Sequence, residues 1–440
     1  MTLEDYLQQD AQLYPDKVAL VGNGEILTYS QLYERVLIKA NQLKGQSYVK
    51  GQIVTVRNTQ SIDFVVTYFA LHIIGCVVAP LEKSMPDELF DKVTMLLSAH
   101  EMPDGIADIL YTTGTTGQSK GVIVSHRAIV ADAENLIDGQ GFSHELVFVI
   151  NGPLNHIGSL SKIYPVVLLG ATIIITDGLK NVNDFFSAFS FPAEKFATFL
   201  VPASIRILIQ FNAERLAALA DKIDFVETGA AAISHDDMKQ LCHLLPKSRL
   251  YNTYASTETG IISTYNFNDG RCIAGCLGRP MKNSKVVITD GGLISCQGDT
   301  LMSGYVGEPE RTATVLHDAT VFTSDIGRLD DEGMLHLSGR EDDVINVGGF
   351  KVAPTDVENA AMAHPDVADC ICIPVKHPIT GVALKLLVVT KNNVLNKKAI
   401  ALFLKMKLEP YKIPMIYEKV ESVRRTYNGK PDRKFYNRQS

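Results

Sequence analysis

Short apolar runs typical of strands alternate with segments of helical spacing through most of the chain. The strand-like runs lie at residues 18–21, 53–57, 172–176, 197–201 and 223–227. Helical spacing is found on both sides of the first run over residues 13–43, and again at 204–211 and 235–245. Because strands that alternate with helices form sheets covered by those helices, the pattern predicts an α/β fold of layered sheets.

The length of the chain predicts more than one domain. A chain of 440 residues exceeds what one hydrophobic core usually organises. Beyond residue 277 the segments shorten and turn signals appear at 290–292 and 331–333, so a small β-rich part is expected there. The final part has its own α/β pattern, with strands expected at 367–373 and 384–390 and a helix at 397–408. A short hinge near Asp342 would separate it from the rest.

Charge and apolar patterning narrow the class of protein. A net charge of -7 at pH 7 argues against a nucleic-acid-binding surface as the main property of the chain. The longest apolar stretch, residues 65–81, contains Thr67, His72 and Gly75, which favours a buried helix, turn and strand over a membrane span. No basic region followed by an apolar core opens the chain, so we expect no signal peptide and a cytoplasmic protein.

The seven cysteines do not predict a disulfide framework, because they are scattered and odd in number. Cys272 and Cys276 lack a second Cys or His pair at ligand spacing, which argues against a zinc site there.

Residues 111–121 form a loop rich in phosphate-binding groups. Its sequence, Tyr-Thr-Thr-Gly-Thr-Thr-Gly-Gln-Ser-Lys-Gly, follows the apolar run 106–110 and holds four threonines, three glycines and one lysine. Glycines let backbone N–H groups turn toward one point, threonines add hydroxyl donors, and lysine adds a mobile positive charge. The common P-loop would need glycine at Ser119 and a hydroxyl at Gly121. A polar turn between strand and helix is the alternative interpretation.

The order of residues in this loop resembles the phosphate-binding signature of the adenylate-forming superfamily, which includes acyl-CoA synthetases, aryl-acid ligases, peptide-synthetase adenylation domains and luciferases. Residues 252–258 resemble the family's Tyr-Gly-x-Thr-Glu motif, with Ala255 where glycine is usual. Residues 323–325 and 339–351 resemble its ribose-binding and hinge motifs, and 426–433 its motif with a catalytic lysine. The chain is therefore identified as a member of this superfamily, similar to acyl-CoA synthetases and aryl-acid ligases.

The resemblance implies a reaction in two steps. The carboxylate of a small acid attacks the α-phosphorus of ATP, giving an acyl-adenylate and pyrophosphate, and the acyl group then passes to the thiol of CoA. Both partners of the first step are anions, so positive charge and Mg²⁺ are needed. The implied architecture is an N-terminal AMP-binding domain, residues 1–340, made of α/β subdomains, and a mobile α+β lid domain, residues 341–440.

Phosphate and metal contacts fall on two of the motifs. The resemblance implies that the phosphates are held by Thr112, Thr113, Gly114, Thr115, Thr116 and Lys120. It implies that Glu258 is the Mg²⁺ ligand, an oxygen donor beside the phosphates, and that Thr257 next to it is catalytic.

The resemblance also implies contacts to the nucleoside at four places in the chain. Tyr254 would stack on adenine, and small residues would let backbone approach the other face of the ring: Gly229, Ala230 and Ala231. Packing at a helix start is the alternative for these small residues. Asp325 would accept from the ribose hydroxyls and Arg340 would contact the ribose or a phosphate, whereas Asp331 is expected to be a turn residue.

Lys430 is implied as the catalytic lysine of adenylation, because a compact, flexible cation on the lid suits charge that develops in the transition state. Asp342 matches the hinge, where backbone torsions would change between the half-reactions. Gly348 and Gly349 would then line the thiol channel, since glycine lets a pantetheine arm pass close to the backbone.

The acyl site is expected near residues 153–158, Pro-Leu-Asn-His-Ile-Gly, which resemble an element of acyl-CoA synthetases with Asn155 in place of an aromatic residue. His156 would gate the carboxylate end, the alternative being a hydrogen-bonded core histidine. Amino-acid-activating relatives carry an acidic residue there, so His156 argues against an α-amino acid. The chain is also shorter between residues 81 and 106 than is general in the family, which predicts that part of a subdomain is missing.

Three functions stay open at this point. The first is an acid–thiol ligase that makes an acyl- or aryl-CoA, and the second transfers the acyl group to the phosphopantetheine of a carrier protein. The third is a degenerate, non-catalytic nucleotide-binding protein, suggested by Ala255 and the shortened region. A set of residues argues against the third: Lys120, Glu258, Asp325, Arg340 and Lys430. An oxygenase of the luciferase kind would have the same fold.

Overall fold

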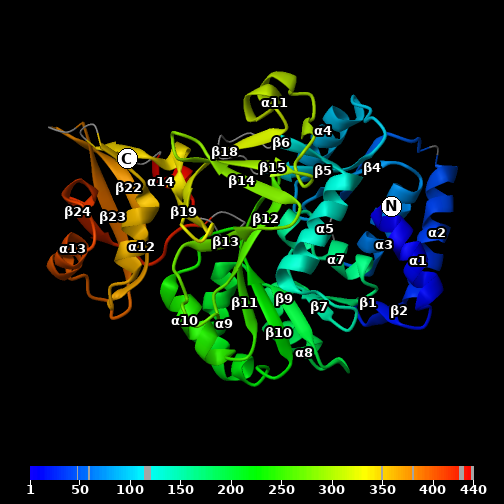
Figure 1. Cartoon of the computed structure of the whole chain (residues 1–440), viewed down its shortest axis with the longest axis horizontal. Helices are drawn as coiled ribbons and strands as arrows, with labels where there is room; N and C mark the ends of the chain where they lie inside the picture. Colours follow the sequence, from blue (N-terminus) through cyan, green and yellow to red (C-terminus); the bar gives the residue numbers. More distant parts are fainter. Residues whose placement is uncertain are drawn as a thin grey trace.

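The computed structural model describes residues 1–46, 48–57, 60–112, 120–347, 350–378, 381–425 and 431–437. Helices cover two large sheets, and a smaller unit that contains the carboxy-terminal strands lies at one end of the molecule (Figure 1). The fold is thus α/β with large sheets and a small C-terminal sheet, which confirms the predicted class.

A fourteen-stranded sheet runs through the large part in the order β14-β15-β18-β19-β13-β12-β11-β10-β9-β7-β8-β1-β2, with β17 beside β18. Its first half along the chain is mostly parallel and contains β1 (Val18–Gly22), β2 (Glu25–Thr28), β7 (Val147–Ile150), β8 (Thr172–Ile175), β9 (Phe196–Phe199), β10 (Ile223–Thr228) and β11 (Arg249–Ser256). Strands β7 and β8 are buried at every residue, as expected of parallel strands covered on both faces.

The second half of this sheet is antiparallel, and it confirms the β-rich part expected beyond residue 277. It contains β12 (Gly260–Asn266), β13 (Cys276–Pro280), β14 (Ser284–Ile288), β15 (Leu293–Gly298), β17 (Leu316–His317), β18 (Thr320–Leu329) and β19 (Leu335–Arg340). Strand β11 pairs parallel with β10 and antiparallel with β12, so the two halves meet at β11.

A five-stranded sheet has the order β16-β6-β5-β4-β3. Its strands are β3 (Ile53–Arg57), β4 (Val77–Leu81), β5 (Ile106–Thr112), β6 (Lys120–Ser125) and β16 (Gly304–Tyr305). The stretch 65–81 is the end of α3 (Ile62–Ile73), a turn and β4, as predicted. No helix in the described ranges is long and apolar enough to cross a bilayer.

The other helices of the large part are α1 (Leu3–Leu13), α2 (Tyr29–Gly45), α4 (Asp87–Ser98), α5 (His126–Gln140), α6 (Ile157–Leu160), α7 (Ile163–Leu168), α8 (Val182–Ala188), α9 (Pro202–Ala217), α10 (His235–Leu244) and α11 (Pro309–Val315). The prediction of helical spacing from residue 13 was wrong at its start, because Leu13 ends α1. The helix expected to end at residue 211 continues to Ala217 across a kink, where Asn212 has non-helical torsions.

The small part contains β20 (Ile345–Val347), β21 (Phe350–Val352), α12 (Pro354–Met362), β22 (Val367–His377), β23 (Gly381–Thr390), α13 (Lys397–Lys405), β24 (Ile416–Lys419) and α14 (Arg433–Asn437). Its two clusters of buried apolar residues draw only on residues from Ile345 onward. In Figure 1 this unit forms the orange and red end of the molecule, beside β19. Separate cores support the predicted boundary at 340/341, which remains a prediction.

Candidate nucleotide and acyl site

The carboxyl ends of β10 and β11 lie side by side and bring two predicted nucleotide segments together. Thr228 on β10 pairs with Asn252 on β11, so Gly229 comes next to Thr253. A Cβ at Gly229 would lie 2.9 Å from the Thr253 carbonyl oxygen, so only glycine fits without a backbone shift. Ala230 follows in the left-handed region, with φ of 67°. Ligands of parallel sheets commonly bind at such carboxyl ends.

Three of the predicted nucleoside residues form one group, joined by an ion pair and a hydrogen bond. Strands β18 and β19 pair Asp325 with Arg340, and the Arg340 Nε lies 3.0 Å from Asp325 Oδ1. The Tyr254 hydroxyl donates to Asp325 Oδ2 at 2.7 Å. Burial, and then the Asp325 carboxylate, raises the pKa of Tyr254 well above its usual range, so this hydroxyl stays a donor. The tyrosine fixes the carboxylate of Asp325 from one side and the arginine fixes it from the other.

Glu258, the predicted metal ligand, lies in a tight turn between β11 and β12. The turn is closed by two hydrogen bonds, from Thr259 N to Ser256 Oγ and from Ser256 N to Thr259 Oγ1, each 3.1 Å long. Gly260 ends the turn with φ of 70°, and a Cβ there would meet Asp132 Oδ1 at 2.6 Å. The predicted catalytic Thr257 is half-buried beside Glu258 in the same turn.

Lys120 and Glu258 meet at a shared neighbour, Tyr305. The Tyr305 hydroxyl donates to Glu258 Oε1 at 3.0 Å, and the Lys120 Nζ lies 4.9 Å from the centre of the tyrosine ring. Strand β16 brings Tyr305 there by pairing with β6, on which Lys120 is the first residue. The ring therefore holds a cation against its face and an anion at its hydroxyl.

The pKa of Lys120 is affected by charges from two of the predicted site residues. Burial lowers its pKa, and the positive charges of Arg311 and Arg340 act in the same direction. The carboxylates of Glu258 and Glu308 oppose this shift. Because charges influence a pKa only over short distances, the phosphate-loop lysine and the Asp325–Arg340 pair belong to one region.

Thr112 ends β5 and pairs in register with Lys120 across the two ends of the predicted phosphate loop. Its Oγ1 is buried and has no hydrogen-bond partner among the described residues. Several predicted residues lie outside the described ranges: Thr113, Gly114, Thr115, Thr116, Gly348, Gly349 and Lys430. The backbone of Asp342 lies in a short 3-10 turn, Glu341–Asp343, and its side chain lies outside the description.

His156 of the predicted acyl element precedes α6 and is half-buried. Burial lowers its pKa, against the opposing charge of Glu82 at the end of β4, so the imidazole is neutral at pH 7. A Cβ at Gly158 would lie 3.1 Å from the Phe199 ring, and one at Gly229 would lie 3.7 Å from the same ring. Phe199 thus separates the predicted acyl element from the predicted adenine loop.

Sequence reasoning missed a buried ion pair beneath this region. Lys162 Nζ lies 2.7 Å from Glu227 Oε2, both side chains are 1% exposed, and Glu227 lies two residues before Gly229. The sequence does contain a signal of this pair, because Glu227 interrupts an apolar strand and Lys162 interrupts an apolar helical segment. Tyr305 was also missed, because it follows no motif and reaches Glu258 only through strand pairing.

Comparison with known proteins agrees with this fold. Residues 7–99 and 91–306 match the AMP-binding enzyme family, and residues 356–430 match the AMP-binding enzyme C-terminal domain. The architecture is that of an adenylate-forming enzyme. The chain belongs to the AMP-binding enzyme family.

Individual relatives are distant. A 2-succinylbenzoate–CoA ligase of Staphylococcus epidermidis is 25% identical over 98% of this chain and 96% of its own length. A 4-coumarate–CoA ligase of Pinus taeda is 26% identical over 76% of this chain and 65% of its own length, which is less than two thirds. The fold is similar to that of ATP-bound MatB from Rhodopseudomonas palustris, with a TM-score of 0.88, 21% identity and coverage of 100% and 99% of the two chains.

Proposed function

We propose that this chain is an acid–thiol ligase that converts a carboxylic acid to an acyl-adenylate with ATP and then transfers the acyl group to CoA. Family membership supports adenylate formation, and the names of the relatives, which are CoA ligases, support CoA as acceptor. ATP and CoA as substrates fit the cytoplasmic location predicted from the sequence. Transfer to a carrier protein remains the alternative acceptor.

The observation that carries the proposal is the Tyr254–Asp325–Arg340 group beside Lys120. Asp325 has both carboxylate oxygens oriented by neighbours, at 2.7 Å from Tyr254 and 3.0 Å from Arg340, which prepares it to accept hydrogen bonds from ribose hydroxyls. Lys120 and Arg340 add positive charge for the phosphates, and the Thr112 hydroxyl, which has no hydrogen-bond partner among the described residues, suits a phosphate oxygen. These residues fit a nucleoside triphosphate.

Glu258 fits a Mg²⁺ site. Its carboxylate is half-buried, and the one hydrogen bond that Tyr305 donates to it leaves lone pairs for a hard cation. The ion would neutralise phosphate charge when bound. The chain itself holds the carboxylate in place through the turn at residues 257–259 and the Tyr305 hydroxyl.

The shape around Phe199 supports an acid pocket separate from the nucleotide. Its ring touches the positions of both Gly158 and Gly229, and the neutral His156 lies at the start of α6. We infer that the acid lies on the His156 side of this ring and the adenine on the Gly229 side. Lys430 would come from the lid, with Asp342 as hinge and Gly348 and Gly349 along the thiol path.

The family match consists of two segments that overlap at residues 91–99, inside the interval predicted to be shortened. Helix α4 (Asp87–Ser98) alone connects β4 to β5 in this interval. This supports the predicted loss of part of a subdomain.

The test is a panel of aryl, short-chain and long-chain carboxylic acids, read by pyrophosphate release with and without CoA. Acid-dependent release with ATP and Mg²⁺, followed by a CoA-dependent thioester, is expected. A thioester formed only with a phosphopantetheinylated carrier protein would favour the second acceptor. ATP binding without pyrophosphate release from any acid would contradict the ligase and favour the non-catalytic alternative.

A further inference from the structure

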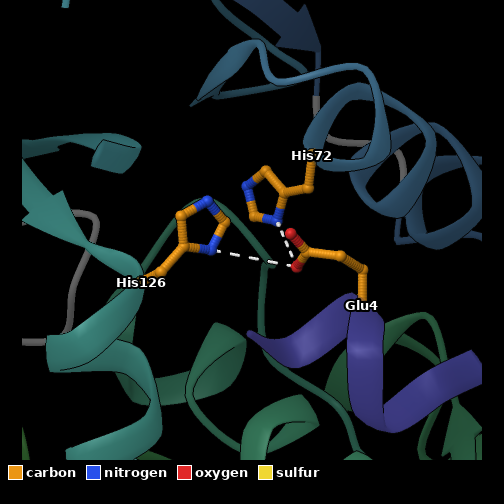
Figure 2. A group of neighbouring side chains, drawn as sticks. All are labelled: Glu4, His72 and His126. Carbon is orange, nitrogen blue, oxygen red and sulfur yellow. Dashed lines mark ion pairs between the residues drawn. The ribbon is translucent and has the colours of Figure 1, made fainter. Parts of the chain in front are cut away.

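A second group of titratable side chains lies where α1, α3 and α5 meet. Glu4 is in the first turn of α1, His72 is in the last turn of α3, and His126 is the first residue of α5. Figure 2 shows the Glu4 carboxylate placed toward a ring nitrogen of each histidine. One ligand-type atom from each of the three residues lies within 4.8 Å of the other two.

The three converging atoms are buried and unsatisfied. Glu4 Oε2, His72 Nδ1 and His126 Nδ1 make no hydrogen bond within the described part of the chain. The His72 and His126 nitrogens are 4.0 Å and 3.8 Å from Glu4 Oε2, which is longer than a hydrogen bond. Buried polar atoms without partners are costly and uncommon, so three that face one point indicate a binding site for a common ligand.

Asp108 on β5 orients His72 from the far side of its ring. The His72 Nε2 lies 3.1 Å from Asp108 Oδ1, and Tyr68 donates to Asp108 Oδ2 at 2.9 Å. A carboxylate only accepts hydrogen bonds, so His72 Nε2 carries a proton, and Nδ1 is the ring nitrogen that faces Glu4. Metal-bound histidines commonly donate their other N–H to a carboxylate in this way.

We propose that Glu4, His72 and His126 bind a divalent transition-metal ion, best matched by Zn²⁺, with Asp108 as a positioning residue. Two imidazole nitrogens and one carboxylate oxygen form a donor set that Zn²⁺ takes. Tetrahedral bonds of about 2.0–2.1 Å place ligand atoms about 3.4 Å apart. The measured 3.8 Å and 4.0 Å separations reach that value by small side-chain shifts. The Glu4 and His126 side chains are 13% and 17% exposed, so the cluster lies near the surface of the large part.

The ion would fasten the amino-terminal helix to the rest of the large part. It would join α1 to α3 and α5, whose ligands are far apart in sequence. The site is distinct from the Mg²⁺ site proposed at Glu258, because His126 follows β6 at the end opposite Lys120, about 17 Å away along an extended strand. Its expected effect is therefore on stability rather than on the adenylation step.

The test uses the full chain, dialysed against a chelator and titrated with Zn²⁺ or Co²⁺. The wild type should bind one equivalent, show Co²⁺ ligand-field bands without a thiolate charge-transfer band, and unfold at a higher temperature with metal. Glu4→Gln and His126→Ala alter the two partly exposed ligands. Each variant should weaken metal binding by more than the roughly 10–100-fold loss that follows from changing a residue that only hydrogen-bonds to a ligand. Each should also abolish the rise in unfolding temperature that the metal causes in the wild type. His243→Ala removes an exposed histidine on α10 and should bind metal as the wild type does.

Far-UV circular dichroism in chelator checks that each variant is folded, and Glu4→Gln keeps the shape of the side chain should His126→Ala fail to fold. The absence of stoichiometric binding by the wild type would overturn the site, as would equal affinity in the wild type and Glu4→Gln. A thiolate band would assign the metal to cysteines. Stabilisation by acid alone, without any metal effect, would show that the cluster is a histidine–glutamate ion pair.

Discussion

The large and small parts of the molecule bury charge in different ways next to their predicted chemistry. In the large part, Lys162 and Glu227 form a pair that is 1% exposed on both sides, beneath the Gly229 loop. In the small part, Arg433 pairs with Glu358 at 2.6 Å with 14% and 11% exposure, a few residues after the predicted catalytic Lys430. Glu358 also accepts from Cys372 N at 2.7 Å.

The two buried ion pairs differ in the segments that they hold in place. The large part places its predicted binding residues at the ends of strands that pack on several clusters of buried apolar residues, and the sealed ion pair lies beneath them. In the small part, Arg433 joins the segment after Lys430 to α12 through a two-pronged contact with Glu358, and this contact would be kept if the lid moves as one unit in the proposed reaction. Preformed binding groups and a movable catalytic cation would suit the proposed two-step reaction.

The largest expected effect tests the sealed pair. Lys162→Met leaves Glu227 buried without a partner and should lower the free energy of unfolding by about 3–5 kcal/mol. Arg433→Met should cost less, because the Glu358 side chain, at 11% exposure, is less completely buried than Glu227 and keeps the Cys372 N–H. Lys247→Met removes an exposed pair with Asp221 and should cost less than about 1 kcal/mol.

Urea unfolding followed by circular dichroism measures all three variants. The double variant Lys162→Met with Glu227→Gln should recover much of the loss, because no charge is left unpaired. If Lys162→Met and Lys247→Met were equally stable, the distinction between sealed and open pairs would be wrong.

The next prediction tests whether Lys430 of the small part acts only in the first step of the proposed reaction. Lys430→Ala should slow adenylation by on the order of 10²-fold or more, the scale of losing one oriented electrostatic group. Thioester formation from supplied acyl-adenylate should change far less. Single-turnover assays of the two half-reactions measure this, and an equal loss in both would contradict a role confined to the first.

A smaller loss is expected at the nucleoside group of the large part. Asp325→Asn keeps the shape but removes the charge, and hydrogen bonds to charged groups contribute about 1.5–3 kcal/mol. We therefore expect kcat/KM for ATP to fall by roughly 10–150-fold. Asp331→Asn, at an exposed turn, is the matched control and should leave kcat/KM unchanged. Similar values for the two variants would remove Asp325 from the nucleotide site.

The smallest effect concerns the metal proposed for the large part. Glu258→Gln keeps the hydrogen bond from Tyr305 but removes the charge that would hold Mg²⁺, so adenylation should need a higher Mg²⁺ concentration. The exposed Glu310→Gln on α11 serves as control. An Mg²⁺ titration that superimposes on the wild-type curve would place the metal elsewhere.

Local patterns determined much of the fold. The spacing of apolar residues predicted the strands β1, β3 and β10 and the helix α10 within about one residue at each end, because each of these segments has a clear periodicity and clear ends. The kink at Asn212 was not visible, since asparagine alone does not break a helix. The motifs predicted that Tyr254, Asp325 and Arg340 act together before any distance was known.

Only the tertiary structure decided which side chains become neighbours across sheets. Tyr305 reaches Glu258 because β16 pairs with β6, and Lys162 meets Glu227 although 65 positions separate them. Glu4, His72 and His126 come together at the junction of three helices and match no sequence motif. Sequence periodicity fixes which face of a segment is buried, since that depends on near neighbours in the chain. Contacts between distant segments depend on strand pairing and helix packing, and these decided the environment of every charge at the site.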